Sequence, residues 1–158
     1  MSTEPTTHHA INTNRKEVRV SAVAITTGDG SVLTVRKAKT DGFMMPGGKA
    51  EPGESPRDAA LREVQEELGF SADPARLESL GTMSAAALNE SGYTVIADVY
   101  LYRAATHEET QLRALKPRAE IAELRWVNPG TDPDNAYTPD QAPLNTECIF
   151  PALVNKLA

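Results

Sequence analysis

The spacing of hydrophobic and polar residues along the chain predicts a mixed α/β fold. Apolar runs rich in β-branched residues, separated by turns that contain glycine or charged residues, are typical of strands. A strong alternation of this kind covers residues 93–102. The predicted strands span residues 18–26, 31–36, 77–85, 93–102 and 121–127.

One segment has helical spacing instead. Ser55 is a suitable N-cap, Pro56 suits the first helical position, and Gly69 supplies a left-handed stop. At about 100° per residue, four apolar residues then share one helix face that can pack on a core. These are Ala60, Leu61, Val64 and Leu68. The pattern therefore predicts a helix over residues 56–68.

The remaining segments are less regular. Residues 43–46 lead into a glycine-containing loop, which holds Gly47, Gly48 and Gly53. Residues 106–118 are predicted to form a charged loop, and residues 129–143 are predicted to form an irregular loop rich in Pro, Asp and Asn. Residues 144–157 have helical apolar spacing and are expected to close the domain.

Composition restricts the class of protein. A chain of 158 residues with 40% hydrophobic content suits one domain, expected over residues 17–158 after a disordered polar tail at residues 1–16. The net charge of -6 argues against a protein that coats nucleic acid or an anionic membrane. The single cysteine, Cys148, and the lack of a long apolar run favour a reducing, cytoplasmic location.

The predicted helix also carries an acidic face. Glu63, Glu66 and Glu67 fall within an arc of about 100° opposite the apolar residues, and like charges this close repel each other. Arg62 can offset Glu66 at i+4, but it cannot neutralise all three carboxylates. A hydrated surface helix would tolerate them. The glycine-containing loop just before the helix instead favours a site for Mg²⁺ and a phosphate.

Residues 48–70 carry a specific motif, G-x5-E-x7-R-E-U-x-E-E-x-G-U, in which U is apolar. The chain matches every position, and it resembles the Nudix hydrolases. The defining residues are Gly48, Glu54, Arg62, Glu63, Glu66, Glu67 and Gly69. The resemblance implies a mixed β-sheet sandwiched between α-helices.

The resemblance also implies residue roles. Glu63, Glu66 and Glu67 would ligate Mg²⁺, with Mn²⁺ as an alternative, and one of them would act as the base, with Glu63 preferred over Glu66. The backbone carbonyl of Gly47 or Gly48 would complete the coordination. Glu54 and Arg62 would hold the loop and the helix together. One further metal-side acid is expected at Glu120, with Glu123 as the alternative.

Substrate-binding residues are less clearly marked. Arg36, Lys37 and Lys49 flank the glycine-containing loop, where they would contact phosphates or be ordinary surface cations. Phe43 or Met45 would provide an apolar surface for a base. Asn145 lies where MutT-like relatives place an asparagine that reads the base, although an Asn there can also cap a helix. These residues extend the predicted site beyond the acidic helix.

The resemblance implies hydrolysis of a nucleoside diphosphate linked to another group. We expect a nucleoside triphosphate, in its ordinary or its oxidised form, to give a monophosphate and pyrophosphate. An ADP-ribose or nucleotide-sugar pyrophosphatase is the alternative, although Ala85–Ala87 occupy the region where such relatives carry a proline. A non-catalytic nucleotide-binding module is a remote third reading. The expected partner is a small nucleotide, and a homodimer is left open.

Overall fold

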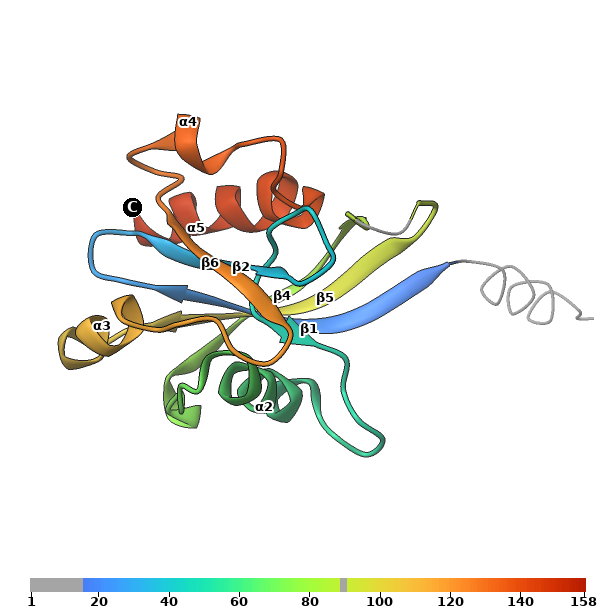
Figure 1. The fold of residues 1–158 in the computed structure, drawn as a ribbon, viewed down its shortest axis with the longest axis horizontal. Helices are drawn as coiled ribbons and strands as arrows, with labels where there is room; N and C mark the ends of the chain where they lie inside the picture. Colours follow the sequence, from blue (N-terminus) through green and yellow to red (C-terminus); the bar gives the residue numbers. More distant parts are fainter. Residues whose placement is uncertain (1–15, 89–90) are drawn as a thin grey trace, which may run out of the picture.

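A mixed sheet lies at the centre of the computed structural model, which describes residues 16–88 and 91–158 (Figure 1). The strand order is β4-β5-β1-β2-β6, and the short β3 also pairs with β1. β1 and β5 are parallel, whereas the other pairs are antiparallel. The strands are β1 (Glu17–Thr26), β2 (Val32–Lys37), β3 (Gly47–Gly48), β4 (Leu77–Ala86), β5 (Thr94–Arg103) and β6 (Ile121–Val127).

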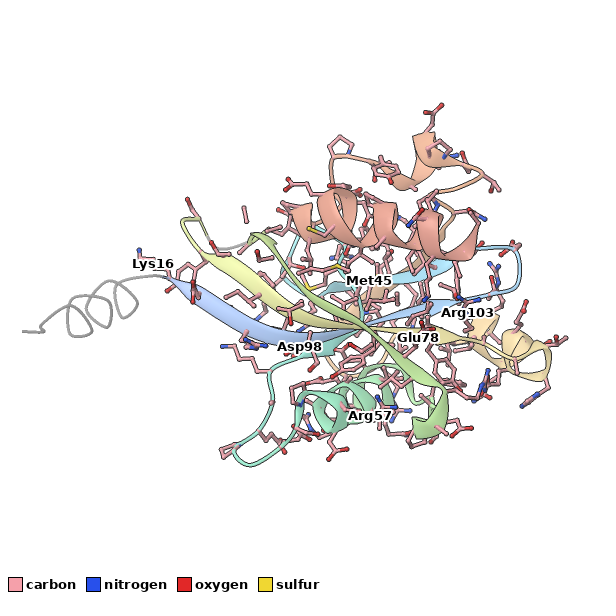
Figure 2. The ribbon with its side chains drawn as sticks, turned by 180° about the vertical axis from the view of Figure 1, so that it is seen from behind. Lys16, Met45, Arg57, Glu78, Asp98 and Arg103 are labelled. Atoms are coloured by element: carbon pink, nitrogen blue, oxygen red, sulfur yellow. The ribbon has the colours of Figure 1, made fainter. Side chains whose placement is uncertain are left out.

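Helices cover both faces of this sheet. On one face, α2 (Pro56–Leu68) packs through Val64 and Leu68 against alternate residues of the strands, such as Val23. On the other face, η2 (Leu144–Ile149) and α5 (Phe150–Leu157) close the second half of the core. Figure 2 shows Met45 on the α5 side and Arg57 on the α2 side. The predicted mixed sheet between helices is therefore confirmed.

Local signals account for the position of α2. The Ser55 side chain accepts a hydrogen bond from the Asp58 N–H at 3.1 Å, which satisfies one of the free donors of the first turn. At the other end Gly69 has φ 68°, and its N–H donates to the Gln65 carbonyl. Arg57 donates from the side of the helix to the carbonyl of Leu77, the first residue of β4, and to that of Pro74 in the preceding turn η1 (Pro74–Arg76). The predicted boundaries of this helix are confirmed.

Two predicted loops contain helices. Residues 106–118 include α3 (Thr106–Arg113), and residues 129–143 include the short α4 (Pro133–Ala136). The prediction of a charged loop was wrong because Glu108 is buried despite its charge. Its carboxylate accepts hydrogen bonds from Tyr102 and Arg76, both at 2.8 Å. The final predicted helix begins with a π-helical turn, η2, before it continues as α5.

Residues 1–15 of the predicted tail lie outside the described residues. Within residues 16–88 and 91–158, no helix combines the length and the apolar character that a membrane crossing requires.

Candidate active site

The glycine-containing loop lies directly between the sheet and the acidic face of α2. Gly47 and Gly48 pair with the central strand β1 at Ala22 and Ser21. Gly47 has φ 154°, and a Cβ there would lie 2.0 Å from the Ser21 carbonyl oxygen. A Cβ on Gly48 would lie 2.4 Å from Oε2 of Glu63. Gly47 therefore requires glycine, because a side chain would meet backbone, whereas a side chain at Gly48 would displace the carboxylate of Glu63.

Glu67 is a carboxylate held inside the protein. Its side chain is 2% exposed, and Oε1 accepts a hydrogen bond from the Gly47 N–H at 3.1 Å. Oε2 is buried and accepts no hydrogen bond in the described part of the chain. Burial raises the pKa of Glu67 to about 7, against the attraction of Lys37 and the Gly47 hydrogen bond. A buried carboxylate oxygen without a partner fits a cation ligand.

Glu63 and Glu66 differ in environment although they lie on the same helix. Glu63 is 15% exposed, and burial raises its pKa, an effect that the positive charge of Arg62 partly offsets. Glu66 is 55% exposed and accepts from Arg62 at 3.2 Å. Only Glu63 of these two lines the cavity described below. Of these two acids, Glu63 is thus the one that faces the cavity.

Arg62 ties the loop to the helix. Its guanidinium makes a bidentate pair with Glu54, with distances of 2.8 and 2.9 Å, and a further N–H donates to the Lys49 carbonyl at 3.1 Å. The remaining nitrogen lies 3.3 Å from Glu63 and 3.2 Å from Glu66. Bidentate pairs of this kind fix geometry as well as charge. Glu54 and Arg62 therefore hold the loop against α2, and of the two only Arg62 also lines the cavity described below.

A second cation lies on the other side of the acids. Lys37 Nζ is 3.8 Å from Oε2 of Glu67 and 3.4 Å from Oε1 of Glu120. Glu123 instead accepts from the neighbouring Arg36 at 3.1 Å. Of the two candidate acids, Glu120 is thus the one on the side of Glu67. It is 62% exposed, so it can change position easily.

A cavity of about 540 Å³ connects the acidic face of α2 with the apolar surface under η2. Arg36 and Phe43 do not line it, because Arg36 pairs with Glu123 and Phe43 is buried with Arg125 over its ring. A wider cavity of about 690 Å³ contains none of the α2 carboxylates. The predicted site residues that line the smaller cavity are Lys37, Met45, Gly47, Gly48, Lys49, Arg62, Glu63 and Asn145.

Asn145 is held rigidly at one end of this cavity. It is buried, and its amide nitrogen donates to the side chain of Gln141 at 2.9 Å and to the Phe43 carbonyl at 3.3 Å. Its side-chain oxygen has no hydrogen-bond partner among the described residues. The side chain makes no helix-capping hydrogen bond, and the residue before η2 is Pro143. The amide instead joins η2 to the segment that leads into the glycine-containing loop.

Apart from Met45, the apolar wall of the cavity was not predicted. It comes mainly from β1, β4 and β5, from the segment that follows β4, and from the start of η2. Alternation within residues 18–26 could have shown that Val18, Val20 and Ala22 share one face. It could not show which helix covers that face. The unpredicted apolar residues are Val18, Val20, Ala22, Met44, Ala86, Ala87, Leu88, Val95, Ala142 and Leu144.

The donor set fits a divalent cation. Carboxylates outnumber the nearby basic groups, and the buried oxygen of Glu67 lacks a hydrogen-bond partner. Within residues 16–88 and 91–158, however, no three acidic, histidine or cysteine side chains are already arranged to hold a metal ion. Arg62 and Lys37 already pair with different members of this set, Arg62 with Glu63 and Glu66 and Lys37 with Glu67. Glu63, Glu66 and Glu67 would therefore need small side-chain movements to hold a cation together.

Comparisons with known proteins identify the family and the fold. A protein from Bacillus subtilis (strain 168) named "Putative 8-oxo-dGTP diphosphatase" is 28% identical over 102 residues, which cover 65% of this chain. The match spans 60% of that protein's length. The NUDIX domain of Shewanella oneidensis NrtR, solved with ADP ribose, superimposes with a TM-score of 0.67 at 14% identity, covering 100% of this chain and 99% of that one.

The MutT protein from Methanosarcina mazei Go1 gives a TM-score of 0.63 at 18% identity, covering 91% of this chain and 94% of that one. At such identities the two structures support the fold alone. The model of the NUDIX domain matches residues 15–145, which include the glycine-containing loop and all of α2. The chain therefore belongs to the Nudix family.

Proposed function

We propose that this protein is a Mg²⁺-dependent hydrolase that cleaves a nucleoside diphosphate linked to another group. The observation that carries the proposal is the buried Glu67, whose Oε2 lacks a hydrogen-bond partner beside the glycine-containing loop. An orphaned carboxylate oxygen is costly unless a cation or a proton completes it. Two residues that contact this carboxylate, Gly47 and Lys37, line the cavity, so the carboxylate lies directly behind the cavity wall.

The bound cation would neutralise phosphate oxygens and lower the pKa of an attacking water. The chain's own residues divide the other tasks. Glu63 lies at the cavity wall with a raised pKa, which suits a general base near neutral pH. Arg62 holds Glu54 and the loop carbonyl of Lys49, so the loop stays in register with α2. Glu66 would ligate the cation after release from Arg62.

The cavity supports an orientation for the nucleotide. The acids and the glycine-containing loop lie at its α2 end, whereas Met45 and Leu144 belong to the core on the α5 side. Phosphates would therefore lie at the α2 end, and a base would pack against the apolar wall. Lys37 and Lys49 line the cavity and would contact phosphate oxygens. Asn145 would hydrogen-bond to the base edge.

We favour a nucleoside triphosphate, hydrolysed to a monophosphate and pyrophosphate. The Bacillus relative named as a diphosphatase of an oxidised triphosphate supports this choice. ADP-ribose is the second candidate, because the Shewanella NUDIX domain binds it.

A nucleotide panel tests the proposal. The protein is incubated with Mg²⁺, or Mn²⁺, and each nucleoside triphosphate, oxidised purine triphosphates or ADP-ribose. Phosphate is then measured after pyrophosphatase for triphosphates, and after phosphatase for ADP-ribose. Glu63→Gln should lower turnover by several orders of magnitude, whereas Glu123→Gln, which loses a charge outside the cavity, should leave it nearly unchanged.

Cleavage of ADP-ribose alone would replace the triphosphate assignment with the second candidate. Nucleotide binding without any turnover would instead identify a non-catalytic binding module.

A further inference from the structure

Two basic side chains divide the carboxylates of the site between them. Arg62 contacts the acids at the loop side of α2, including Glu54 and Glu66. Lys37 contacts the acids at the other end, Glu67 and Glu120. Arg62 is fixed by several hydrogen bonds, whereas Lys37 makes ion pairs at 3.4 and 3.8 Å, which are longer than a hydrogen bond. The lysine is therefore the cation that can be displaced more readily.

The backbone around Lys37 holds it in this position. A register shift between Arg36 and Lys37 places Arg36 opposite Glu123 but Lys37 opposite Ile121. The next residue, Ala38, donates its N–H to the Glu120 carbonyl at 2.8 Å. This arrangement brings Glu120 next to the lysine and leaves Glu123 to pair with the arginine. Bulges commonly redirect side chains beside functional sites.

Backbone strain occurs at the same place. Lys39 has φ 70° and Ala119 has φ 55°. In the part of the chain that the structure describes, they are the two non-glycine residues with positive φ. One follows Lys37 closely, and the other precedes Glu120. Strained residues persist where the surrounding contacts hold them, and such residues cluster at functional sites.

We propose that Lys37 is a built-in counter-ion for Glu67, which competes with the divalent cation for that carboxylate. This inference rests on the proposed use of a metal by the same site. The Lys37 ammonium lies nearest to the Glu67 oxygen that accepts no hydrogen bond, so one positive charge already occupies the surroundings of the best cation ligand. A divalent ion that binds there must overcome repulsion from this ammonium and take Glu67 from it.

Lys37 thus lowers the affinity for metal. It also protects the metal-free protein from an uncompensated buried carboxylate. Glu120 provides a second, exposed partner to which the ammonium can move when Glu67 binds the cation. The lysine can accordingly leave one carboxylate without losing every opposite charge.

Calorimetric titration of Mn²⁺ into the metal-free protein at pH 8 tests the proposal without any measurement of activity. Lys37→Met removes the charge, Lys37→Gln does so with a polar side chain, and Lys37→Arg keeps it. Arg36→Met is the matched control, because it removes the same charge one residue away, where the partner is Glu123. Ionic strength is kept constant.

We expect Lys37→Met and Lys37→Gln to bind Mn²⁺ about tenfold more tightly than the wild type. Lys37→Arg and Arg36→Met should stay within about twofold of it. In EDTA, Lys37→Met should also unfold at a lower temperature than the wild type, because Glu67 has lost the Lys37 ammonium as its partner. Added metal should raise the unfolding temperature of this variant by more than it raises that of the wild type. Lys37→Gln provides the same comparison if the methionine variant does not fold.

Unchanged or weaker binding by both neutral variants would overturn the proposal while leaving metal binding by the wild type intact. An equal increase in Mn²⁺ affinity in Arg36→Met would also overturn the proposal, because the affinity would then depend on the net charge of the protein and not on the position of Lys37. Failure of every protein to bind Mn²⁺ at millimolar concentration would refute both this inference and the proposed function.

Discussion

Glu67→Gln should change how the stability of the metal-free protein depends on pH. The pKa of Glu67 is raised from 4.5 to about 7 by burial, so the folded state binds a proton more tightly than the unfolded state does. Between these values the unfolded chain loses the proton while the folded protein keeps it. The free energy of unfolding therefore falls as pH rises through this window. Above the window, the loss of unfolding free energy caused by ionisation of Glu67 stays constant.

The size of the effect follows from the same values. The difference between a pKa of 4.5 for Glu67 in the unfolded chain and a pKa of about 7 in the folded protein corresponds to about 3 kcal/mol of unfolding free energy. Glutamine cannot ionise, yet its side-chain oxygen can still accept the Gly47 N–H that now donates to Oε1. Relative to the wild type, the variant should thus gain about 3 kcal/mol between pH 4.5 and pH 8. Other titrating groups largely cancel in this comparison.

Urea unfolding in EDTA at several pH values measures the difference. Glu66→Gln is the matched control on the same helix, because Glu66 is 55% exposed and should change stability by less than about 0.5 kcal/mol at each pH. Added Mg²⁺ should stabilise the wild type but not Glu67→Gln. Parallel pH profiles for wild type and Glu67→Gln would refute the reasoning, since the carboxylate would then titrate alike in both states.

Three further predictions concern the loop, α3 and the cavity. Gly47→Ala should cost more than about 2 kcal/mol of unfolding free energy, because its Cβ would meet a backbone carbonyl at 2.0 Å. Gly53 also has a positive φ of 79°, but a Cβ added there would meet nothing within 4 Å. Gly53→Ala should therefore lower the free energy of unfolding, measured with urea, by about 1 kcal/mol. Although burial opposes ionisation, hydrogen bonds lower the pKa of Glu108 overall, so its contribution is present above pH 4.5 and lost at lower pH. Glu108→Gln should unfold more easily at pH 7 and show a flatter stability profile below pH 4.5. Asn145→Ala should raise KM by an amount equivalent to about 1–3 kcal/mol of substrate binding and leave the affinity for Mn²⁺ unchanged. An unchanged KM together with lower stability would instead show that this amide has a purely structural role.

The accuracy of the sequence predictions depended on how local each signal was. Helix α2 was predictable because Ser55, Pro56 and Gly69 determine its ends within the segment itself. Helix α3 was not, because its eight residues gain their stability from Arg76 and Tyr102, which lie in other elements. A short helix of this kind has little intrinsic stability, so tertiary contacts decide whether it forms.

The substrate-binding residues show the same limit. Phe43 and Met45 are separated by one residue, and the sequence predicted that one or the other would provide an apolar surface for a base. Met45 lines the cavity, whereas Phe43 lies against Arg125, whose guanidinium carbon is 3.7 Å from the ring centre. Apolar character alone does not distinguish them, because the difference depends on a partner 82 positions away from Phe43 in the sequence, on strand β6.

Ion pairs between residues of different elements were harder to predict than the packing of apolar residues. The motif identified the acidic residues because their spacing within one helix is fixed. It identified one counter-ion, Arg62, but not the other, because Lys37 meets Glu120 only through the pairing of β2 with β6 and meets Glu67 only where that edge approaches α2. A one-residue shift in that pairing is what separates Arg36, with Glu123, from Lys37. Since a shift of this kind leaves no mark in composition or periodicity, the distribution of positive charge in this site becomes visible only in the folded protein.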